Sequence, residues 1–216
     1  MDYALARTKM VDNQIRTTDV TSHSVLSAFL SVPREIFVPE KLRALAYIDN
    51  DIEVAPCRYV MEPSPLAKLL QLAQIRPEDK VLEIACGSGY ASALLACLST
   101  DVVALESDAG LAETAKANLA AQGFGNVSVV TGDLEKGHAA KGPYDVIFIN
   151  GAVEIVPEDL FRQLKDGGRL VTVVGFGLAS RAKVFLNEGG VVSERPEFNT
   201  SVKPLPGFRK VAAFVF

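Results

Sequence analysis

The sequence predicts an α/β protein, built on a doubly wound, mainly parallel sheet with an antiparallel C-terminal strand and an N-terminal helical extension. Three observations support this prediction. From Lys80 onward, short apolar runs alternate with helix-forming segments, which is the pattern of parallel strands joined by right-handed crossovers. The first apolar run breaks into a Gly-x-Gly turn at residues 87–89. The end of the chain instead has the pattern of a hairpin and a further strand, which indicates antiparallel pairing at one edge.

Short helices and a loop are predicted before residue 64. The apolar residues of a first helix fall approximately on one face: Ala4, Leu5, Met10, Val11 and Ile15. A second helix can be capped by Thr21 or Ser22 and ends at Pro33. Residues 51–63 contain two prolines and are predicted to be irregular. Ser64 is then expected to cap a helix that has Pro65 in its first turn.

The alternating part of the chain contains five predicted strands and three predicted helices. The strands cover residues 81–85, 102–106, 127–131, 144–149 and 169–174, and the helices cover 90–98, 109–122 and 157–164. Gly167 and Gly168 are interpreted as the stop of the last helix. A hairpin is predicted from residues 182–186 and 191–194 around the turn 187–190, with a final strand over 211–216.

The composition is ordinary for a globular protein and argues against several function classes. Of the 216 residues, 49% are apolar and 22% are charged, with a formal net charge of −4. No Lys/Arg run could neutralise the phosphates of a nucleic acid, and no apolar stretch approaches the roughly 20 residues of a membrane span. Because no secretory leader is recognisable, the chain is expected to be cytoplasmic. Three cysteines without CxxC spacing and two histidines predict neither a disulfide, nor a metal site, nor a hydrolytic triad.

Polar side chains follow the predicted parallel strands where each strand ends. Glu106 ends the second strand, the position at which nucleotide-type folds bind ribose hydroxyls. Asp133 follows the third strand, where it could accept from an adenine amino group, and Asn150 ends the fourth. The first turn lacks the third glycine of the dinucleotide motif. Carboxylates with few lysines nearby suit a sulfonium better than a pyrophosphate, so the pattern resembles class I S-adenosylmethionine-dependent methyltransferases, which are Rossmann-like.

Over nearly its whole length the chain resembles the protein-L-isoaspartate O-methyltransferase family. Five segments carry the resemblance: an opening helix (10–16), a linker (32–39), the landmark 45–47, the cofactor loop (81–90) and the approach to the fifth strand (164–170). The opening is the most specific of them, because many methyltransferases share the cofactor motifs. The resemblance implies methyl transfer from S-adenosylmethionine, without a metal, to the α-carboxylate of isoaspartyl residues in damaged proteins, which initiates their repair. S-adenosylhomocysteine is the product.

The resemblance also implies where each ligand binds. Residues 1–63 are expected to form the helical extension and substrate loop, and residues 64–216 the cofactor-binding domain, within one compact unit. The cofactor is expected to contact Glu83, Ala85, Gly87, Ser88, Gly89, Glu106, Ser107, Asp133, Leu134 and Asn150.

The substrate loop departs from the family pattern. The family usually has Gln-Thr-Ile-Ser before a Gln-Pro pair, with the hydroxyls beside the transferred methyl group, whereas this chain has Arg-Tyr-Val-Met before Glu62-Pro63. Met61 cannot donate a hydrogen bond, but Arg58 and Tyr59 can, and these three are the candidate catalytic residues. Arg58 could bind a carboxylate in bidentate fashion, or it could be a solvated loop residue. The alternatives that remain open are an isoaspartyl peptide as acceptor, another small acceptor, or cofactor binding without transfer.

Overall fold

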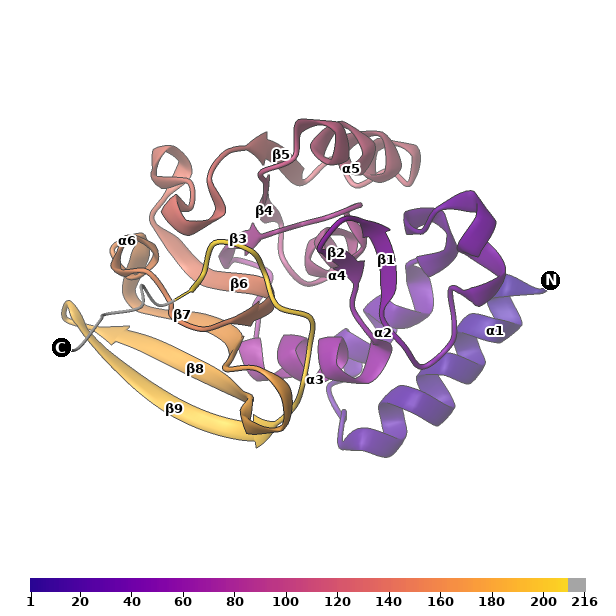
Figure 1. Ribbon diagram of the computed structural model, residues 1–216, viewed down its shortest axis with the longest axis horizontal. Coiled ribbons are helices and arrows are strands. Elements are labelled where there is room, and N and C mark those ends of the chain that lie inside the picture. Colours follow the sequence, from indigo (N-terminus) through magenta and orange to yellow (C-terminus); the bar gives the residue numbers. More distant parts are fainter. Residues whose placement is uncertain (210–216) are drawn as a thin grey trace, which may run out of the picture.

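The computed structural model describes residues 1–209, and its main sheet has seven strands in the order β5-β4-β3-β6-β7-β8-β9 (Figure 1). These strands are β3 (Lys80–Ile84), β4 (Asp101–Glu106), β5 (Val127–Thr131), β6 (Tyr144–Val153), β7 (Leu164–Val174), β8 (Arg181–Glu188) and β9 (Val191–Asn199). The strands from β5 to β7 are parallel to their neighbours, and β8 and β9 extend the sheet in antiparallel fashion. The predicted fold class is confirmed. Strand order reverses between β3 and β6, the switch point where open α/β sheets bind ligands.

Helices and loops cover both faces of the sheet. The α-helices of the described part are α1 (Tyr3–Met10), α2 (His23–Ser31), α3 (Pro63–Ala73), α4 (Tyr90–Leu98), α5 (Ala109–Ala121) and α6 (Glu158–Phe161). On one face, Val81 and Phe148 share a core with α1 to α4. On the other face, Leu82 and Ile149 pack against residues of α6 and of the segment 202–208. Neighbouring strand residues enter different cores because successive side chains of a strand point to opposite faces.

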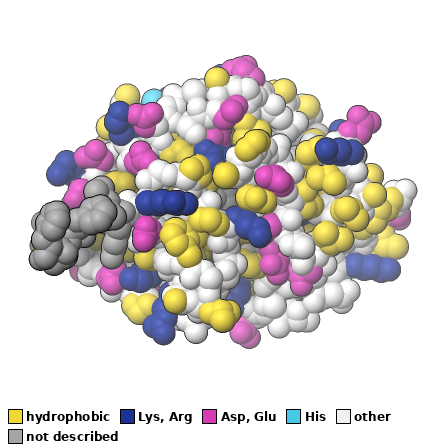
Figure 2. Space-filling view, viewed as in Figure 1, with side chains coloured by type: hydrophobic (Ala, Val, Ile, Leu, Met, Phe, Trp, Pro, Cys, Tyr) yellow, Lys and Arg dark blue, Asp and Glu magenta, His cyan; other side chains and the backbone are white. Residues whose placement is uncertain are grey.

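The N-terminal extension is packed into the first of these cores. Met10, Val11 and Ile15 are at most 1% exposed, as predicted, whereas Leu5 from the same predicted face is 51% exposed. Ser22 rather than Thr21 caps α2, since its Oγ accepts from the N–H of Val25. Figure 2 shows apolar side chains gathered on the right of this view, over the N-terminal helices. In the described part of the chain, no helix is both long enough and apolar enough to cross a membrane.

The segment 51–63 differs from its predicted irregular form, because it contains a second, two-stranded sheet. Strand β1 (Ile52–Ala55) pairs antiparallel with β2 (Arg58–Val60). Ser64 is also not a helix cap: α3 starts at Pro63, and the Ser64 hydroxyl donates to Thr18 Oγ1 instead (2.9 Å). A proline at the first helical position needs no N–H donor there. Only Met61 and Glu62 separate the hairpin from α3.

The predicted helix 157–164 is shorter than expected, and Gly167-Gly168 is not a helix stop. The helix covers only Glu158–Phe161, and β7 already begins at Leu164, which pairs with Tyr144. A Cβ on Gly168 would lie 2.8 Å from the carbonyl oxygen of Lys165 and 2.9 Å from that of Tyr144. Glycine is needed here because two backbones approach closely within a bulged strand. The predicted hairpin exists as β8 and β9, and the predicted strand 211–216 lies outside the described residues.

Candidate active site

The turn after β3 (residues 85–89) brings the backbone close to the space above the strand ends. Three of its residues have positive φ: Ala85 (67°), Gly87 (59°) and Gly89 (96°). A Cβ on Gly89 would also lie 3.3 Å from side-chain atoms of Leu119, so both conformation and space favour glycine there. Ala85 adopts the left-handed region in spite of its Cβ. Such strain costs about 1–3 kcal/mol and clusters at ligand sites.

Glu83 lies in β3 beneath this turn and is fully buried. Its carboxylate accepts from the Ser92 hydroxyl and from Nδ2 of Asn150 (3.1 Å). Burial raises the pKa of Glu83 to about 7, although both hydrogen bonds lower it. The other amide atom, Asn150 Oδ1, is buried and has no hydrogen-bond partner in the described structure. An unpaired buried acceptor is uncommon. Asn150 does not end the strand as predicted, because β6 continues to Val153, and Asn150 lies where its register shifts between Phe148 and Ala152.

Glu106 ends β4 and is surrounded by donors. One carboxylate oxygen accepts from the backbone N–H groups of Ser107 (2.8 Å) and Asp108 (3.2 Å), and the other from that of Gly87 (3.0 Å). The Ser107 hydroxyl donates as well (3.3 Å), and the Arg58 guanidinium is the fifth donor, with Nε at 3.0 and 3.1 Å from the two oxygens. None of the Glu106 side chain is exposed to solvent. The strand-end carboxylate predicted for a ribose is thus saturated by protein groups.

Arg58 reaches Glu106 from the β1–β2 hairpin. Its side chain is only 7% exposed, its Nη2 donates to the Ser107 hydroxyl (2.8 Å), and its Nη1 donates to the carbonyl of Cys57 (3.1 Å). The turn of the hairpin is tight, because Cys57 has a φ of 59°. The structure therefore brings Arg58 together with the predicted cofactor residues Glu106 and Ser107. Sequence reasoning had placed it with the methyl acceptor instead.

The N-terminal linker holds the hairpin and the glycine turn in place. Arg34 is completely buried and donates to the carbonyls of Ala46 (2.7 Å) and Val60 (3.5 Å). The Ser88 hydroxyl donates to the carbonyl of Phe37 (2.5 Å), so its oxygen is engaged with the linker. The segment 32–39, one of the family landmarks, consequently supports both walls of the site.

Tyr59 and Met61 line what space remains between the hairpin and the strand ends. A cavity of about 20 Å³ is bounded by Arg58, Tyr59, Met61, Ala85, Asn150, Gly151, Lys203 and Leu205, among others. A second cavity of about 10 Å³ lies between Tyr59, Met61, Tyr90 and Asn150. Each holds about one water molecule. Met61 is 4% exposed and packs into the core.

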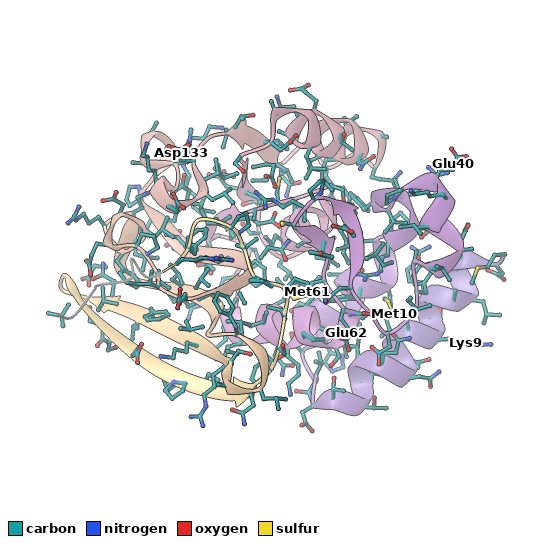
Figure 3. All side chains as sticks on the ribbon, in the orientation of Figure 1. Lys9, Met10, Glu40, Met61, Glu62 and Asp133 are labelled. Atoms are coloured by element: carbon teal, nitrogen blue, oxygen red, sulfur yellow. The ribbon has the colours of Figure 1, made fainter. Side chains whose placement is uncertain are left out.

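Asp133 and Leu134 lie at the other end of the row of strands. The N–H of Gly132 donates to the carbonyl of Glu106 (3.0 Å), which places the end of β5 beside that of β4. Leu134 is buried, whereas Asp133 is exposed and paired with Lys136 Nζ (2.5 Å). In Figure 3 Asp133 is at the upper left and Met61 near the centre, so the predicted adenine and methyl-transfer positions lie at separate ends of the site.

Lys203 and Leu205 are site residues that sequence reasoning missed. They belong to the segment after β9, which returns over the sheet and carried no recognisable motif. The close approach of this segment to β6 has one indication in the sequence, which is the glycine at position 151. A Cβ on Gly151 would lie 2.6 Å from Leu205 Cγ, so only glycine admits this contact.

Comparison with known families identifies the chain. The model of the protein-L-isoaspartate(D-aspartate) O-methyltransferase family matches residues 5–205. The chain belongs to this family. The predicted family, and the predicted class of an S-adenosylmethionine-dependent O-methyltransferase, are confirmed.

Curated relatives in the isoaspartate O-methyltransferase family are similar over most of the chain. The protein-L-isoaspartate O-methyltransferase of Koribacter versatilis is 40% identical over 173 residues, which are 80% of this chain and 78% of the relative. The protein-L-isoaspartate O-methyltransferase 1 of Rhodopseudomonas palustris is 37% identical over 204 residues, 94% of this chain and 83% of the relative. The similarity thus extends through the N-terminal extension.

Solved structures in the isoaspartate O-methyltransferase family share the fold. One protein-L-isoaspartate O-methyltransferase superposes with a TM-score of 0.79 and 29% identity, covering 93% of this chain and 66% of that one. A Plasmodium falciparum protein described with S-adenosylhomocysteine bound has a TM-score of 0.80, covers 92% of this chain and 97% of its own, and is 18% identical, so it supports the fold alone. Within residues 1–209, no group of three or more His, Cys, Asp or Glu side chains could hold a metal ion.

Proposed function

We propose that this chain transfers the methyl group of S-adenosylmethionine to the α-carboxylate of isoaspartyl residues in proteins or peptides. The observation that carries the proposal is Glu106, a strand-end carboxylate beside a glycine turn at the switch point, in a chain of this family. A methyl-transfer assay with an isoaspartyl peptide tests it, with the matched aspartyl peptide as control. Cofactor binding without transfer to the isoaspartyl peptide would contradict the proposal.

The residues at the strand ends have the chemistry that the cofactor needs. Glu106 can accept hydrogen bonds from the two ribose hydroxyls, and the unpartnered Oδ1 of Asn150 can accept from the ammonium of the methionine portion. Glu83 orients that amide by accepting from its Nδ2. The remaining contacts are proposed for the two turns and the end of β5: Ala85, Gly87, Ser88 and Gly89 with the methionine portion, Ser107 with the ribose, and Asp133 and Leu134 with the adenine.

Arg58 must leave Glu106 before a ribose can bind there. Among the described residues, the donors to Glu106 are three backbone N–H groups, the Ser107 hydroxyl and Arg58, and of these Arg58 alone belongs to the hairpin, so another conformation of the hairpin could withdraw it. The cavity of about 20 Å³ beside it is far smaller than the about 300–1,000 Å³ of small-molecule sites, and a larger cavity of about 350 Å³, lined by Arg58, Ser107 and Asp108 among others, does not include the buried Glu106. The structure therefore represents a closed state, and cofactor binding is expected to displace the β1–β2 hairpin.

Arg58→Gln is expected to tighten S-adenosylhomocysteine binding about tenfold. The change removes the competitor for Glu106, so less of the binding free energy is used to open the site. Calorimetry measures the affinity, with Arg162→Gln as control because Arg162 forms an exposed pair with Asp159. Unchanged or weaker binding in Arg58→Gln would mean that Arg58 stays on Glu106 in the complex.

The chain's part in the reaction is to align the acceptor. A carboxylate has a pKa near 4 and is ionised at neutral pH, so no general base is required. When bound, the cofactor supplies an electrophilic methyl group on a sulfonium. The new bond forms between that carbon and a carboxylate oxygen as the bond to sulfur breaks, which leaves an ester and a neutral thioether. The hairpin and the strand ends hold the acceptor in line and exclude water.

Met61→Ser is expected to raise the rate of methyl transfer several-fold over Met61→Ala. Both changes remove the same buried side chain and cost about 2–5 kcal/mol of stability. Only serine restores a hydroxyl that can hold the acceptor carboxylate. Single-turnover rates with an isoaspartyl peptide, at a temperature where both variants are folded, make the comparison. Equal rates would show that a hydroxyl at this position does not assist transfer.

A further inference from the structure

The segment after β9 adds a wall to the proposed active site. In Figure 1 this yellow segment crosses the sheet near β6. The N–H of Ala152 donates to the carbonyl of Lys203 (2.9 Å), and the N–H of Leu205 donates to the carbonyl of Ala152 (2.8 Å). The close contact of Leu205 with Gly151 presses the segment against β6. The backbone of Lys203 is thereby fixed beside the end of the strand that carries Asn150.

The Lys203 side chain is a cation at the rim of the cavity. It lines the same cavity as Tyr59, Met61 and Asn150, and its Nζ lies 5.7 Å from the centroid of the Tyr59 ring. The face of an aromatic ring attracts an ammonium group. Among residues 1–209, no carboxylate lies within 4.0 Å of its Nζ. Arg58, the other cation on this cavity, is paired with Glu106, and Asp51 is the carboxylate that lines the cavity, with its Oδ1 accepting from the N–H of Glu62 (2.9 Å).

The acceptor of the proposed reaction is an anion, which needs a hydrogen-bond donor or a cation at this cavity. Met61 has no donor, whereas an ammonium group offers three. Tyr59 adds a hydroxyl, which donates to Glu53 Oε1 (3.4 Å). Desolvation and the neighbouring Glu53 raise the pKa of Tyr59, so its hydroxyl stays protonated, and the long hydrogen bond to Glu53 can be exchanged for one to an incoming carboxylate. A negatively charged group at this rim would meet Lys203 and Tyr59 together.

We propose that Lys203, supported by the ring of Tyr59, binds the α-carboxylate of the isoaspartyl residue and so determines acceptor specificity. The inference rests on the proposed function and deepens it. A single ammonium holds one carboxylate oxygen and leaves the other free to attack the methyl group. The product ester is neutral and loses this attraction, so Lys203 favours binding of the substrate over binding of the product.

Equilibrium binding tests the assignment in the presence of saturating S-adenosylhomocysteine. The probe is a C-terminally amidated peptide whose isoaspartyl residue bears its only carboxylate, and the reference is its α-methyl ester. Lys203→Met is expected to weaken binding of the acid peptide about five- to tenfold, with binding of the ester and of S-adenosylhomocysteine unchanged. Lys203→Arg should retain most of the affinity. Added salt should weaken binding of the acid peptide to the wild type more than to Lys203→Met.

Lys68→Met is the matched control, because Lys68 Nζ also lies over an aromatic ring, that of Phe198 (4.4 Å), but does not line the cavity. It should bind both peptides as the wild type does. Unchanged acid-peptide affinity in Lys203→Met would overturn the assignment, as would an equal loss for acid and ester, which indicates a purely structural role. A wild-type protein that binds S-adenosylhomocysteine but neither binds nor methylates the isoaspartyl peptide would overturn the proposed function itself.

Discussion

Glu106→Ala is expected to lower the free energy of unfolding by about 3–5 kcal/mol, because the variant leaves the guanidinium of Arg58 buried without its anion. The Arg58 side chain is 7% exposed, and its remaining acceptors are the Ser107 hydroxyl and the Cys57 carbonyl. Neither of these neutralises its charge. Urea denaturation of the ligand-free protein measures the loss. Asp133→Ala, which removes an exposed ion pair with Lys136, is the control and should change stability by less than about 1 kcal/mol.

The double variant Arg58→Ala/Glu106→Ala separates the structural role of Glu106 from its ligand-binding role. Without either charge, most of the stability lost in Glu106→Ala should return, because no buried ion remains unpaired. S-adenosylhomocysteine should still bind more than tenfold more weakly than to the wild type, since the ribose has lost its acceptor. A double variant as unstable as Glu106→Ala would contradict the buried pair. Wild-type cofactor affinity in it would contradict the ribose assignment.

Glu83 is expected to make the folded protein less stable as the pH rises from about 5 to 8. Its pKa is about 7 in the folded protein and 4.5 by reference, so between these values the folded state holds a proton that the unfolded state has released. This contribution is fully present below pH 4.5 and is lost as the pH rises through 7. The shift corresponds to a change on the order of 3 kcal/mol.

Glu83→Gln removes this pH dependence and keeps partners for Ser92 and Asn150, because an amide both donates and accepts. The free energy of unfolding of the wild type minus that of Glu83→Gln, measured in urea from pH 4.5 to 8, should fall with rising pH. Taking the difference cancels the pH dependence that other titrating groups contribute. Asp145 is one of these groups: partial burial raises its pKa, but the hydrogen bonds from Lys165 and from the backbone of Lys80 lower it further. Glu113→Gln, at an exposed pair, is the control. Parallel curves for the wild type and Glu83→Gln would refute the shifted pKa of Glu83.

The sequence alone determined the parts of this protein that depend on local pattern. The strands and helices between Lys80 and Ala121 begin and end within one or two residues of their predicted bounds, because alternation of apolar runs with glycine turns is a property of neighbouring residues. Glu106 was predicted at a strand end, and that is where it lies. The family segments at residues 10–16 and 32–39 added the N-terminal extension, whose core residues Met10 and Ile15 are buried as predicted.

Only the tertiary structure decided which side chains meet at the site. Arg58 and Glu106 are 48 positions apart and belong to different sheets, and Lys203 comes from a segment that folds back after the last described strand. No periodicity encodes such contacts, because a loop residue has no fixed face from which its direction could be deduced. Whether Glu106 has all its hydrogen bonds and whether the Asn150 oxygen lacks one are known only from the donors that surround them in the folded protein. The sequence shows which groups are able to bind a ligand, but the packing of the folded chain determines which of them already bind one another.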